Sequence, residues 1–224
     1  KRGMRQGVAD EGGFWPNFKS NEEGLIELVA SIADAGLRPG SDVGIALDIA
    51  ATQLYQGGLY HLALENRSLT AEQMQSMLLR WVERYPIVSI EDPFAETDAA
   101  AMQAFTRAAG PRLQIVGDDF FCTQASRVTL AVANNTCNTV LLKPNQVGTL
   151  SETLACWEAA RKGGYRAIVS ARSGETEDVS IVHLAIGWGI SQLKVGSFSR
   201  SERMAKWNEA IRIEESLGIK AMPY

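Results

Sequence analysis

Charged side chains stand at the ends of several short apolar runs, and their types suggest metal and acid–base chemistry. Acidic side chains follow three of these runs, at Asp48, Glu91 and Asp118. Lys143 follows a fourth run, and Lys194 lies within the last. In a (β/α)8 barrel the carboxyl ends of all strands open on one face, which carries the active site. We therefore expect these five side chains to meet there.

Three carboxylates in one semi-buried place repel one another and lose hydration, so they need a counter-charge. A hard divalent cation would supply it, and an all-oxygen set without His or Cys favours Mg²⁺ over zinc. A lysine beside a metal and a second ammonium group can have its pKa lowered enough to act as a base. For one acid alone, a helix cap or a surface ion pair would be the simpler interpretation. Three successive strand ends with two lysines instead favour removal of a proton next to a substrate carboxylate.

An anion anchor is predicted after a further strand. Arg172 and Ser173 precede a helix predicted to begin near Glu175, and a guanidinium, a hydroxyl and a helix N-terminus together bind phosphate or carboxylate. Taken alone, the motif would equally suit a helix cap and a surface arginine. His61 lies on a predicted hairpin, and His183 lies in an apolar helical run that indicates a core position. The acid–base work is therefore assigned to lysine and glutamate.

Parallel strands are needed to position these residues. Most predicted strands are apolar at consecutive positions, which is typical of strands buried on both faces of a parallel sheet. Helices with recognisable N-caps and one hairpin around Gly57-Gly58 separate them. The predicted strands span residues 6–9, 43–47, 87–90, 113–116, 139–142, 167–169 and 192–195. The clearest predicted helices span residues 22–35, the segments capped by Thr70 and by Thr149, and residues 201–217.

Repeated strand–helix units are typical of a (β/α)8 barrel or of a doubly wound open sheet. The chain has no Gly-x-Gly-x-x-Gly motif and no Gly-Lys-Ser/Thr loop, which favours the barrel. Seven predicted strands are one fewer than a closed barrel needs, and no linker-like stretch divides the chain. We predict one α/β domain over residues 1–224, a barrel that lacks its first strand.

The composition excludes several classes of protein. Apolar residues make up 46% and charged residues 21% of the chain, a globular balance. A net charge of −4 without a basic run argues against a nucleic-acid partner, and no apolar stretch reaches the roughly 18 residues of a membrane span. Three widely spaced cysteines indicate a reducing compartment, so we expect a cytoplasmic location. Because the chain does not begin with methionine, we expect it to be part of a longer protein.

The sequence resembles the enolase family along essentially its whole length. The resemblance implies an enolase-type barrel preceded by a smaller N-terminal domain, and it implies proton abstraction assisted by Mg²⁺, a strategy for which the enolase superfamily is itself a standard example. Family members are usually homodimers or larger homo-oligomers. The matching motifs, in order, are DEGGFWPN (10–17), ALDIAA (46–51), SIEDPF (89–94), VGDD (116–119), LKPNQVGT (142–149), RSGETED (172–178), RSER (200–203) and RIEE (212–215).

The resemblance also implies a role for each candidate residue in converting 2-phosphoglycerate to phosphoenolpyruvate, a step of glycolysis. Mg²⁺ would be held by Asp48, Glu91 and Asp118. The catalytic groups would be Lys143, which takes the α-proton, Lys194, which stabilises the enolate, and Glu11, which protonates the leaving 3-hydroxyl. The phosphate would be held by Arg172 and Ser173. The residues implied to contact this small phosphorylated acid are Glu91, Asp118, Lys143, Arg172, Ser173 and Lys194.

Several departures from the family pattern leave alternatives open. Ala171 stands where the family has a histidine on the leaving-group side, and a methyl group can neither donate a hydrogen bond nor carry a proton. Gln53, Trp15 and Pro144 also differ from the usual residues. One alternative is therefore an enolase-like enzyme acting on a phosphonate or related substrate, such as carboxyphosphonoenolpyruvate synthase. A second is an inactive enolase-like binding protein, against which the retained acidic and lysine residues argue.

Overall fold

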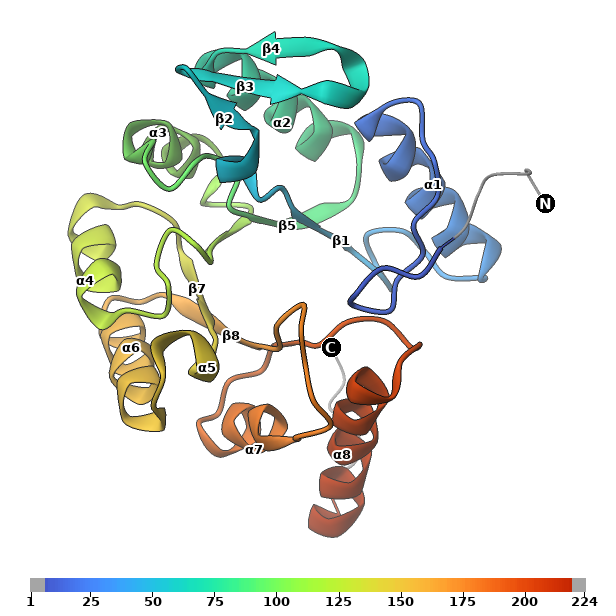
Figure 1. Cartoon of the computed structure of the whole chain (residues 1–224), viewed down its shortest axis with the longest axis vertical. Coiled ribbons are helices and arrows are strands. Elements are labelled where there is room, and N and C mark those ends of the chain that lie inside the picture. The colour runs from blue at the N-terminus through green and yellow to red at the C-terminus, as the bar shows by residue number, and fades with distance from the viewer. Residues whose placement is uncertain (1–6, 219–224) are drawn as a thin grey trace.

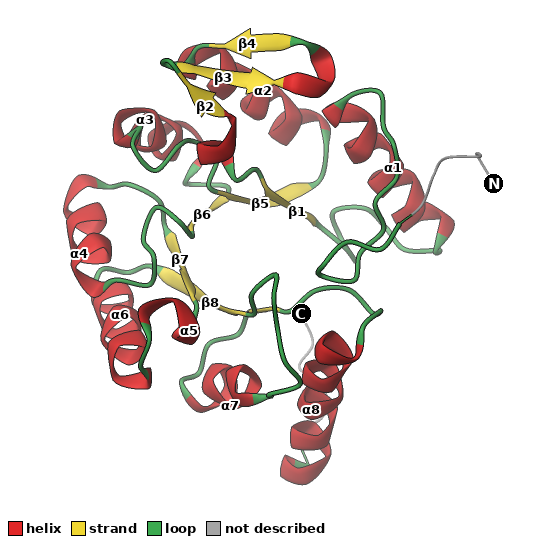
Figure 2. Ribbon diagram, in the orientation of Figure 1, coloured by secondary structure: helices red, strands yellow, loops and turns green. Residues whose placement is uncertain are grey.

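A computed structural model describes residues 7–218, and its centre is a curled sheet of six parallel strands. The strand order is β1-β5-β6-β7-β8-β9, so β1 and β9 form its two edges. The helices pack around the outside of the curl (Figures 1 and 2). The strands are β1 (Ile45–Asp48), β5 (Ile87–Glu91), β6 (Gln114–Gly117), β7 (Thr139–Leu142), β8 (Arg166–Ser170) and β9 (Leu193–Lys194). The predicted barrel class is confirmed, in the form of an incomplete barrel.

The helices follow the strands along the chain and begin at recognisable caps. Thr70 and Gln73 form the predicted capping box, in which each side chain accepts from the backbone N–H of the other. The last helix has the predicted bounds and ends at Gly218, whose φ of 62° closes it. The α-helices are α1 (Asn21–Asp34), α2 (Ala71–Arg84), α3 (Ala99–Ala109), α4 (Ala125–Asn134), α5 (Pro144–Val147), α6 (Leu150–Lys162), α7 (Ser180–Gly187) and α8 (Ser201–Leu217). Two short 3-10 helices are η1 (Ala51–Leu54) and η2 (Ala63–Glu65).

A small antiparallel sheet between β1 and α2 contains the predicted hairpin. Gly57 and Gly58, with φ of 60° and 82°, make its turn. The buried Tyr60 attaches this sheet to the barrel, because its hydroxyl donates to Asp98 Oδ2 at 2.9 Å and accepts from the Ala95 N–H at 3.1 Å. The strands are β2 (Tyr55–Gln56), β3 (Leu59–Leu62) and β4 (Arg67–Leu69). The third strand of this sheet, β4, was not predicted from the sequence.

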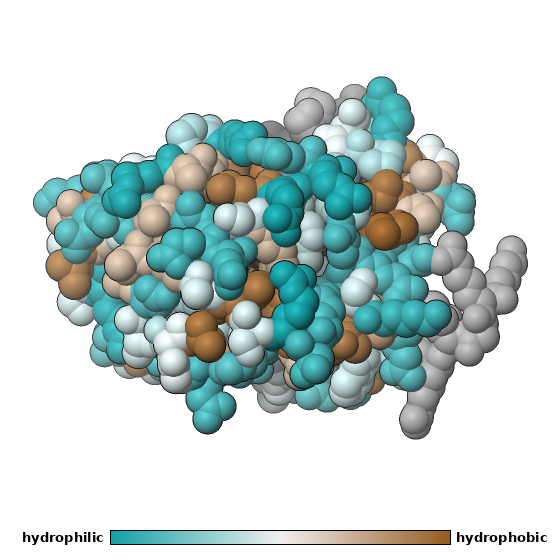
Figure 3. Space-filling view, turned by 90° about the horizontal axis from the view of Figure 1, so that it is seen from above, coloured by the Kyte–Doolittle hydropathy of each residue, from teal (hydrophilic) through white to brown (hydrophobic). Residues whose placement is uncertain are grey.

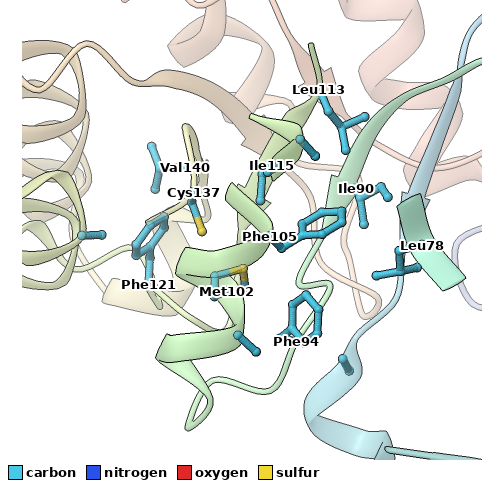
Figure 4. Packing of buried hydrophobic residues seen from close by; sticks show 14 of the residues in the cluster. Leu78, Ile90, Phe94, Met102, Phe105, Leu113, Ile115, Phe121, Cys137 and Val140 are labelled. Carbon is cyan, nitrogen blue, oxygen red and sulfur yellow. The ribbon is translucent and has the colours of Figure 1, made fainter. Parts of the chain in front are cut away.

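The hydrophobic core lies between the parallel sheet and the helices outside it (Figure 4). Strand residues Ile90 and Ile115 are fully buried. The rings of Phe94 and Phe105 pack edge to face, with centroids 5.7 Å apart. This packing holds the strands whose carboxyl ends carry the charged residues.

The first strand was predicted over residues 6–9. Residue 6 lies outside the described residues, and at residues 7–9 the prediction is wrong. Val8 makes only an isolated antiparallel bridge with Phe14. Gly12 adopts a φ of 83°, and the Ala9 N–H donates to the Gly13 carbonyl at 2.9 Å. The segment therefore folds back on itself instead of joining the parallel sheet.

The surface seen in Figure 3 is mainly hydrophilic, with hydrophobic side chains scattered over it. Within residues 7–218, none of the helices combines the length and apolarity needed to cross a bilayer. Trp15, which differs from the residue usual in the family, is 70% exposed. It therefore lies on the surface and not in the core.

Candidate active site

The first part of the site is an ion-pair cluster that joins the two edges of the sheet. The parallel register sets Asp48 of β1 beside Glu91 of β5. Lys194 of β9 donates hydrogen bonds of 2.9 Å to Asp48 Oδ2 and to both carboxylate oxygens of Glu91. Because β1 and β9 are opposite edges, Lys194 spans the open side of the barrel. The structure thus brings three of the predicted site residues into direct contact.

Burial governs the charges of this cluster. The Glu91 side chain is 6% exposed, and burial, aided by the charge of Asp48, raises its pKa to about 8. Burial would lower the pKa of Lys194, but the charges of Glu91 and Asp48 outweigh burial and hold that pKa above its usual value. In the metal-free protein the pKa of Lys194 is therefore raised, whereas the lowered pKa was expected beside a bound metal. Its ammonium group acts as a fixed positive charge.

The second part of the site is the pair formed by Lys143 after β7 and Asp118 after β6. Lys143 Nζ lies 2.5 Å from Asp118 Oδ2, and the two side chains are 12% and 11% exposed. The other carboxylate oxygen, Asp118 Oδ1, is buried and accepts no hydrogen bond from residues 7–218. An unpaired buried carboxylate oxygen is unfavourable, so this position suits a further cation or donor.

Asp92 holds the backbone that carries Asp118, and sequence reasoning missed this function. Its buried carboxylate accepts the backbone N–H groups of Asp118 at 2.9 Å and Asp119 at 2.8 Å. Its φ of 40° is unusual for a residue with a side chain. Burial raises the pKa of Asp92 to about 7. The only signal in the sequence was its position next to Glu91.

The third part of the site is the predicted anion anchor. Ser173 Oγ donates to Glu11 Oε1 at 3.2 Å, which brings the proposed acid and the anchor together. Arg172 Nη1 lies 3.4 Å from Asn145 Oδ1 at the start of α5. The guanidinium and hydroxyl of the anchor are therefore present on adjoining loops.

The helix predicted to begin near Glu175 is wrong, because α7 begins at Ser180. Glu175 Oε1 instead accepts the backbone N–H of Arg172 at 2.9 Å. Asp178 Oδ1 accepts the N–H of Ser180 at 2.8 Å. Residues 171–179 form an irregular loop held by side chains, so the anchor lacks the helix N-terminus that was predicted for it.

A cavity of about 670 Å³ lies beside the Lys194 cluster. Asp48, Glu91 and Lys194 form part of its lining, with apolar side chains from α7 and α8. The volume is in the range of small-molecule sites. The other five predicted site residues lie outside this lining, namely Glu11, Asp118, Lys143, Arg172 and Ser173. The candidate residues therefore lie in three groups, which are Asp48 with Glu91 and Lys194, Asp118 with Lys143, and Glu11 with Arg172 and Ser173. The Ala171 N–H donates to the Lys194 carbonyl at 2.8 Å.

The carboxylates were predicted to bind one metal ion, but they pair with lysines here. No group of three or more His, Cys, Asp or Glu side chains among the described residues is arranged to hold a metal ion. Lys194 contacts Asp48 and Glu91, and Lys143 contacts Asp118. The donor chemistry nevertheless fits a hard cation, because every candidate ligand is a carboxylate oxygen and Asp118 Oδ1 is unpaired within residues 7–218.

The histidines lie apart from these groups. His61 contacts Ser68 Oγ and the Gln56 carbonyl on the hairpin, at 2.8 and 3.0 Å. The core position predicted for His183 is wrong, since its side chain is 56% exposed and contacts Glu209 Oε1 at 3.1 Å. Both rings have partners outside the candidate site, in keeping with acid–base chemistry by lysine and glutamate.

The curled parallel sheet with charged residues at its strand ends defines a TIM-barrel type of domain. Over residues 1–224 the chain matches the family described as "Enolase, C-terminal TIM barrel domain". It is 52% identical over 217 residues to the protein named "Enolase 1" of Desulfitobacterium hafniense (strain Y51), covering 96% of this chain and 50% of that protein. The chain belongs to the enolase family, which confirms the resemblance seen in the motifs. It spans about half the length of this curated relative.

Proposed function

We propose that the protein is a magnesium-dependent hydro-lyase that converts 2-phosphoglycerate to phosphoenolpyruvate and water, as in glycolysis. The observation that carries the proposal is the pairing of two lysines with carboxylates at the strand ends. Lys194 contacts Asp48 and Glu91, and Lys143 contacts Asp118. Enolate chemistry needs this combination of a proton acceptor and concentrated positive charge beside a substrate carboxylate.

Positive charge would stabilise the enolate. Asp48, Glu91 and Asp118 are the residues that would hold Mg²⁺, which when bound neutralises charge on the substrate carboxylate. In the metal-free protein the charges of Glu91 and Asp48 hold the pKa of Lys194 above its usual value despite burial. Its ammonium group would thus supply preorganised positive charge as the enolate forms.

The protons balance over one turnover. Lys143 would take the proton from C2, the C3–O bond would break, and Glu11 would protonate the departing hydroxyl so that water leaves. Lys143 then returns a proton to solvent and Glu11 regains one. Ser173 Oγ, 3.2 Å from Glu11 Oε1, would orient this acid. Arg172 and Ser173 would bind the phosphate by charge-assisted hydrogen bonds.

Ala171 favours a second candidate function. Its side chain is buried directly after β8, and its N–H donates to the Lys194 carbonyl at 2.8 Å. The methyl group therefore lies next to the strand that carries the proposed enolate stabiliser, where the family has a histidine. A paralogue could keep proton abstraction by Lys143 but use another leaving group or electrophile, on a phosphonate or another substrate related to 2-phosphoglycerate.

The test is phosphoenolpyruvate formation by the longest protein that the natural reading frame encodes, with Mg²⁺ and 2-phosphoglycerate. An Ala171→His variant is assayed beside it. We expect slow turnover that requires Mg²⁺ and that the histidine accelerates. Exchange of the C2 proton without product would instead support the second candidate. Neither exchange nor product would support the inactive binding protein and refute the proposal.

We also propose that the protein acts in the cytoplasm as a homodimer or larger homo-oligomer. The three cysteines, Cys122, Cys137 and Cys156, are unpaired, which suits a reducing compartment. Light scattering of the natural-length protein would test the assembly, and a monomer at micromolar concentration would refute it.

A further inference from the structure

Helix α8 carries two fully buried cations that the proposed chemistry does not use. Arg203 and Lys206 are both 0% exposed. They lie three residues apart, on one face of the helix. Burying a charged group is costly unless it is paired and hydrogen-bonded, so their partners show what each cation holds in place.

Arg203 binds four backbone carbonyls from three separate segments. Its Nη1 donates to the carbonyls of Arg172 at 2.7 Å and Val195 at 2.9 Å. Its Nη2 donates to those of Ser173 at 2.7 Å and Asp10 at 3.2 Å. The carbonyls of Arg172 and Ser173 belong to the irregular loop 171–179, here called the anchor loop. Val195 directly follows Lys194, and Asp10 directly precedes Glu11. The rigid fork of a guanidinium suits this arrangement, which a lysine could not reproduce.

Lys206 holds the anchor loop from its other side. Its Nζ donates to the Thr176 carbonyl at 2.8 Å and lies 3.0 Å from Glu175 Oε2. The other oxygen, Glu175 Oε1, accepts the backbone N–H of Arg172 at 2.9 Å. Both polar groups of the Arg172 backbone are therefore fixed, the carbonyl by Arg203 and the N–H through Glu175.

The segment that carries Glu11 is attached to the same place. The Ser197 N–H donates to the Glu11 carbonyl at 2.8 Å. Gly196 has a φ of 130°, and a Cβ there would lie 2.5 Å from the Glu11 carbonyl oxygen and 2.9 Å from Arg203 Cδ. Only a glycine lets these segments approach so closely around the Arg203 side chain.

We propose that Arg203 and Lys206 are positioning residues that set the loops of Glu11, Arg172 and Ser173 relative to Lys194. The irregular loop 171–179 has few backbone partners of its own, so the two buried cations supply them. This inference deepens the proposed function and rests on it for the role of the loops. The contacts themselves can be tested independently of activity.

The first experiment measures amide hydrogen exchange by mass spectrometry in the natural-length protein, over segments 8–13 and 171–179. The variants are Arg203→Lys, Arg203→Met and Lys206→Met, with Arg212→Met as the control on the same helix, since the Arg212 side chain is 58% exposed. We expect exchange in both segments to rise by about tenfold or more in Arg203→Lys. Lys206→Met should affect segment 171–179 alone, and Arg212→Met neither segment.

The second experiment measures KM and kcat for 2-phosphoglycerate, together with inhibition by inorganic phosphate. Losing charged hydrogen bonds to the anchor loop should raise KM and weaken phosphate inhibition by about 10- to 100-fold in Arg203→Lys. A variant that is only less stable would lose active enzyme and hence kcat, with KM unchanged.

These outcomes separate the inference from the proposed function. Absence of turnover in the unmodified protein would refute the proposed function, while the hydrogen-exchange data would still test whether Arg203 and Lys206 hold these loops. If the Arg203 variants do not fold, the fully buried guanidinium is a folding requirement, and Lys206→Met with Glu175→Gln tests the loop instead. Unchanged exchange in 171–179 in folded Lys206→Met and Arg203→Lys would overturn the inference.

Discussion

Replacing Lys194 by methionine should destabilise the protein, because it leaves two neighbouring carboxylates without their shared cation. Three hydrogen bonds of 2.9 Å would be lost. Removing one partner of a buried ion pair costs about 3–5 kcal/mol. Glu91 is 6% exposed, but Lys194 is 31% and Asp48 44% exposed, so we expect about 2–3 kcal/mol after allowing for solvent screening.

The assay is urea unfolding followed by far-UV circular dichroism without Mg²⁺, at a pH above about 8, where Glu91 is ionised in the unmodified protein. With a slope of about 2–3 kcal/mol per molar urea, the Lys194→Met midpoint should fall by about 1 M. Adding Glu91→Gln should recover about 1–2 kcal/mol, because it removes the uncompensated buried charge. The control Lys162→Met, at the exposed end of α6, should change stability by less than about 0.5 kcal/mol. An unchanged Lys194→Met midpoint, or a double variant no more stable than the single, would refute the reasoning.

Three further predictions follow from single residues. Burial raises the pKa of Glu91 from an ordinary 4.5 to about 8 and that of Asp92 from 3.8 to about 7, so the folded state binds more protons in this window. The metal-free protein should therefore lose stability as pH rises from about 5 to 8, by about 1 kcal/mol per pH unit for each of the two groups below its folded-state pKa. In urea titrations Glu91→Gln should reduce that dependence to the part contributed by Asp92, and a stability that rises over this range would contradict the prediction. Gly196→Ala should lower the free energy of unfolding by more than about 2 kcal/mol, because a Cβ would meet the Glu11 carbonyl. The control Gly57→Ala, which has open space around it, should lower it by only about 1 kcal/mol. Equal losses in the two variants would argue against close packing at Gly196. Asp92→Asn should cost about 1–3 kcal/mol, since an amide offers one acceptor for two backbone N–H groups; an unchanged thermal midpoint would show that Asp92 does not hold that loop.

The strands and most helices could be predicted because their signals are local. The run at residues 139–142 is apolar throughout, and β7 has the predicted bounds. Thr70 with Gln73 marks the start of α2, and Gly218 marks the end of α8. The charged residues at the strand ends followed from these elements, because parallel strands direct their carboxyl ends to one face.

The remaining features depend on contacts between distant segments, which the sequence does not display. Residues 175–179 carry acids typical of a helix start, yet Lys206 and Arg203 hold the preceding loop so that α7 begins later, at Ser180. Nothing in the sequence of α8 marks Arg203 and Lys206 as buried. The pKa direction of Lys194 likewise depends on two carboxylates more than 100 residues away in the chain. Residues 7–9 form no strand because the glycine turn after them pairs the chain with itself.

The most direct test of the proposed function is exchange of the C2 proton of 2-phosphoglycerate in heavy water, followed by proton NMR with Mg²⁺ present. The unmodified protein should exchange this proton, whether or not phosphoenolpyruvate forms. Lys143→Met should reduce the exchange rate by at least about 100-fold while the protein stays folded. Exchange that persists in Lys143→Met would contradict the assignment of the base, and no exchange in the unmodified protein would contradict enolate chemistry at this site.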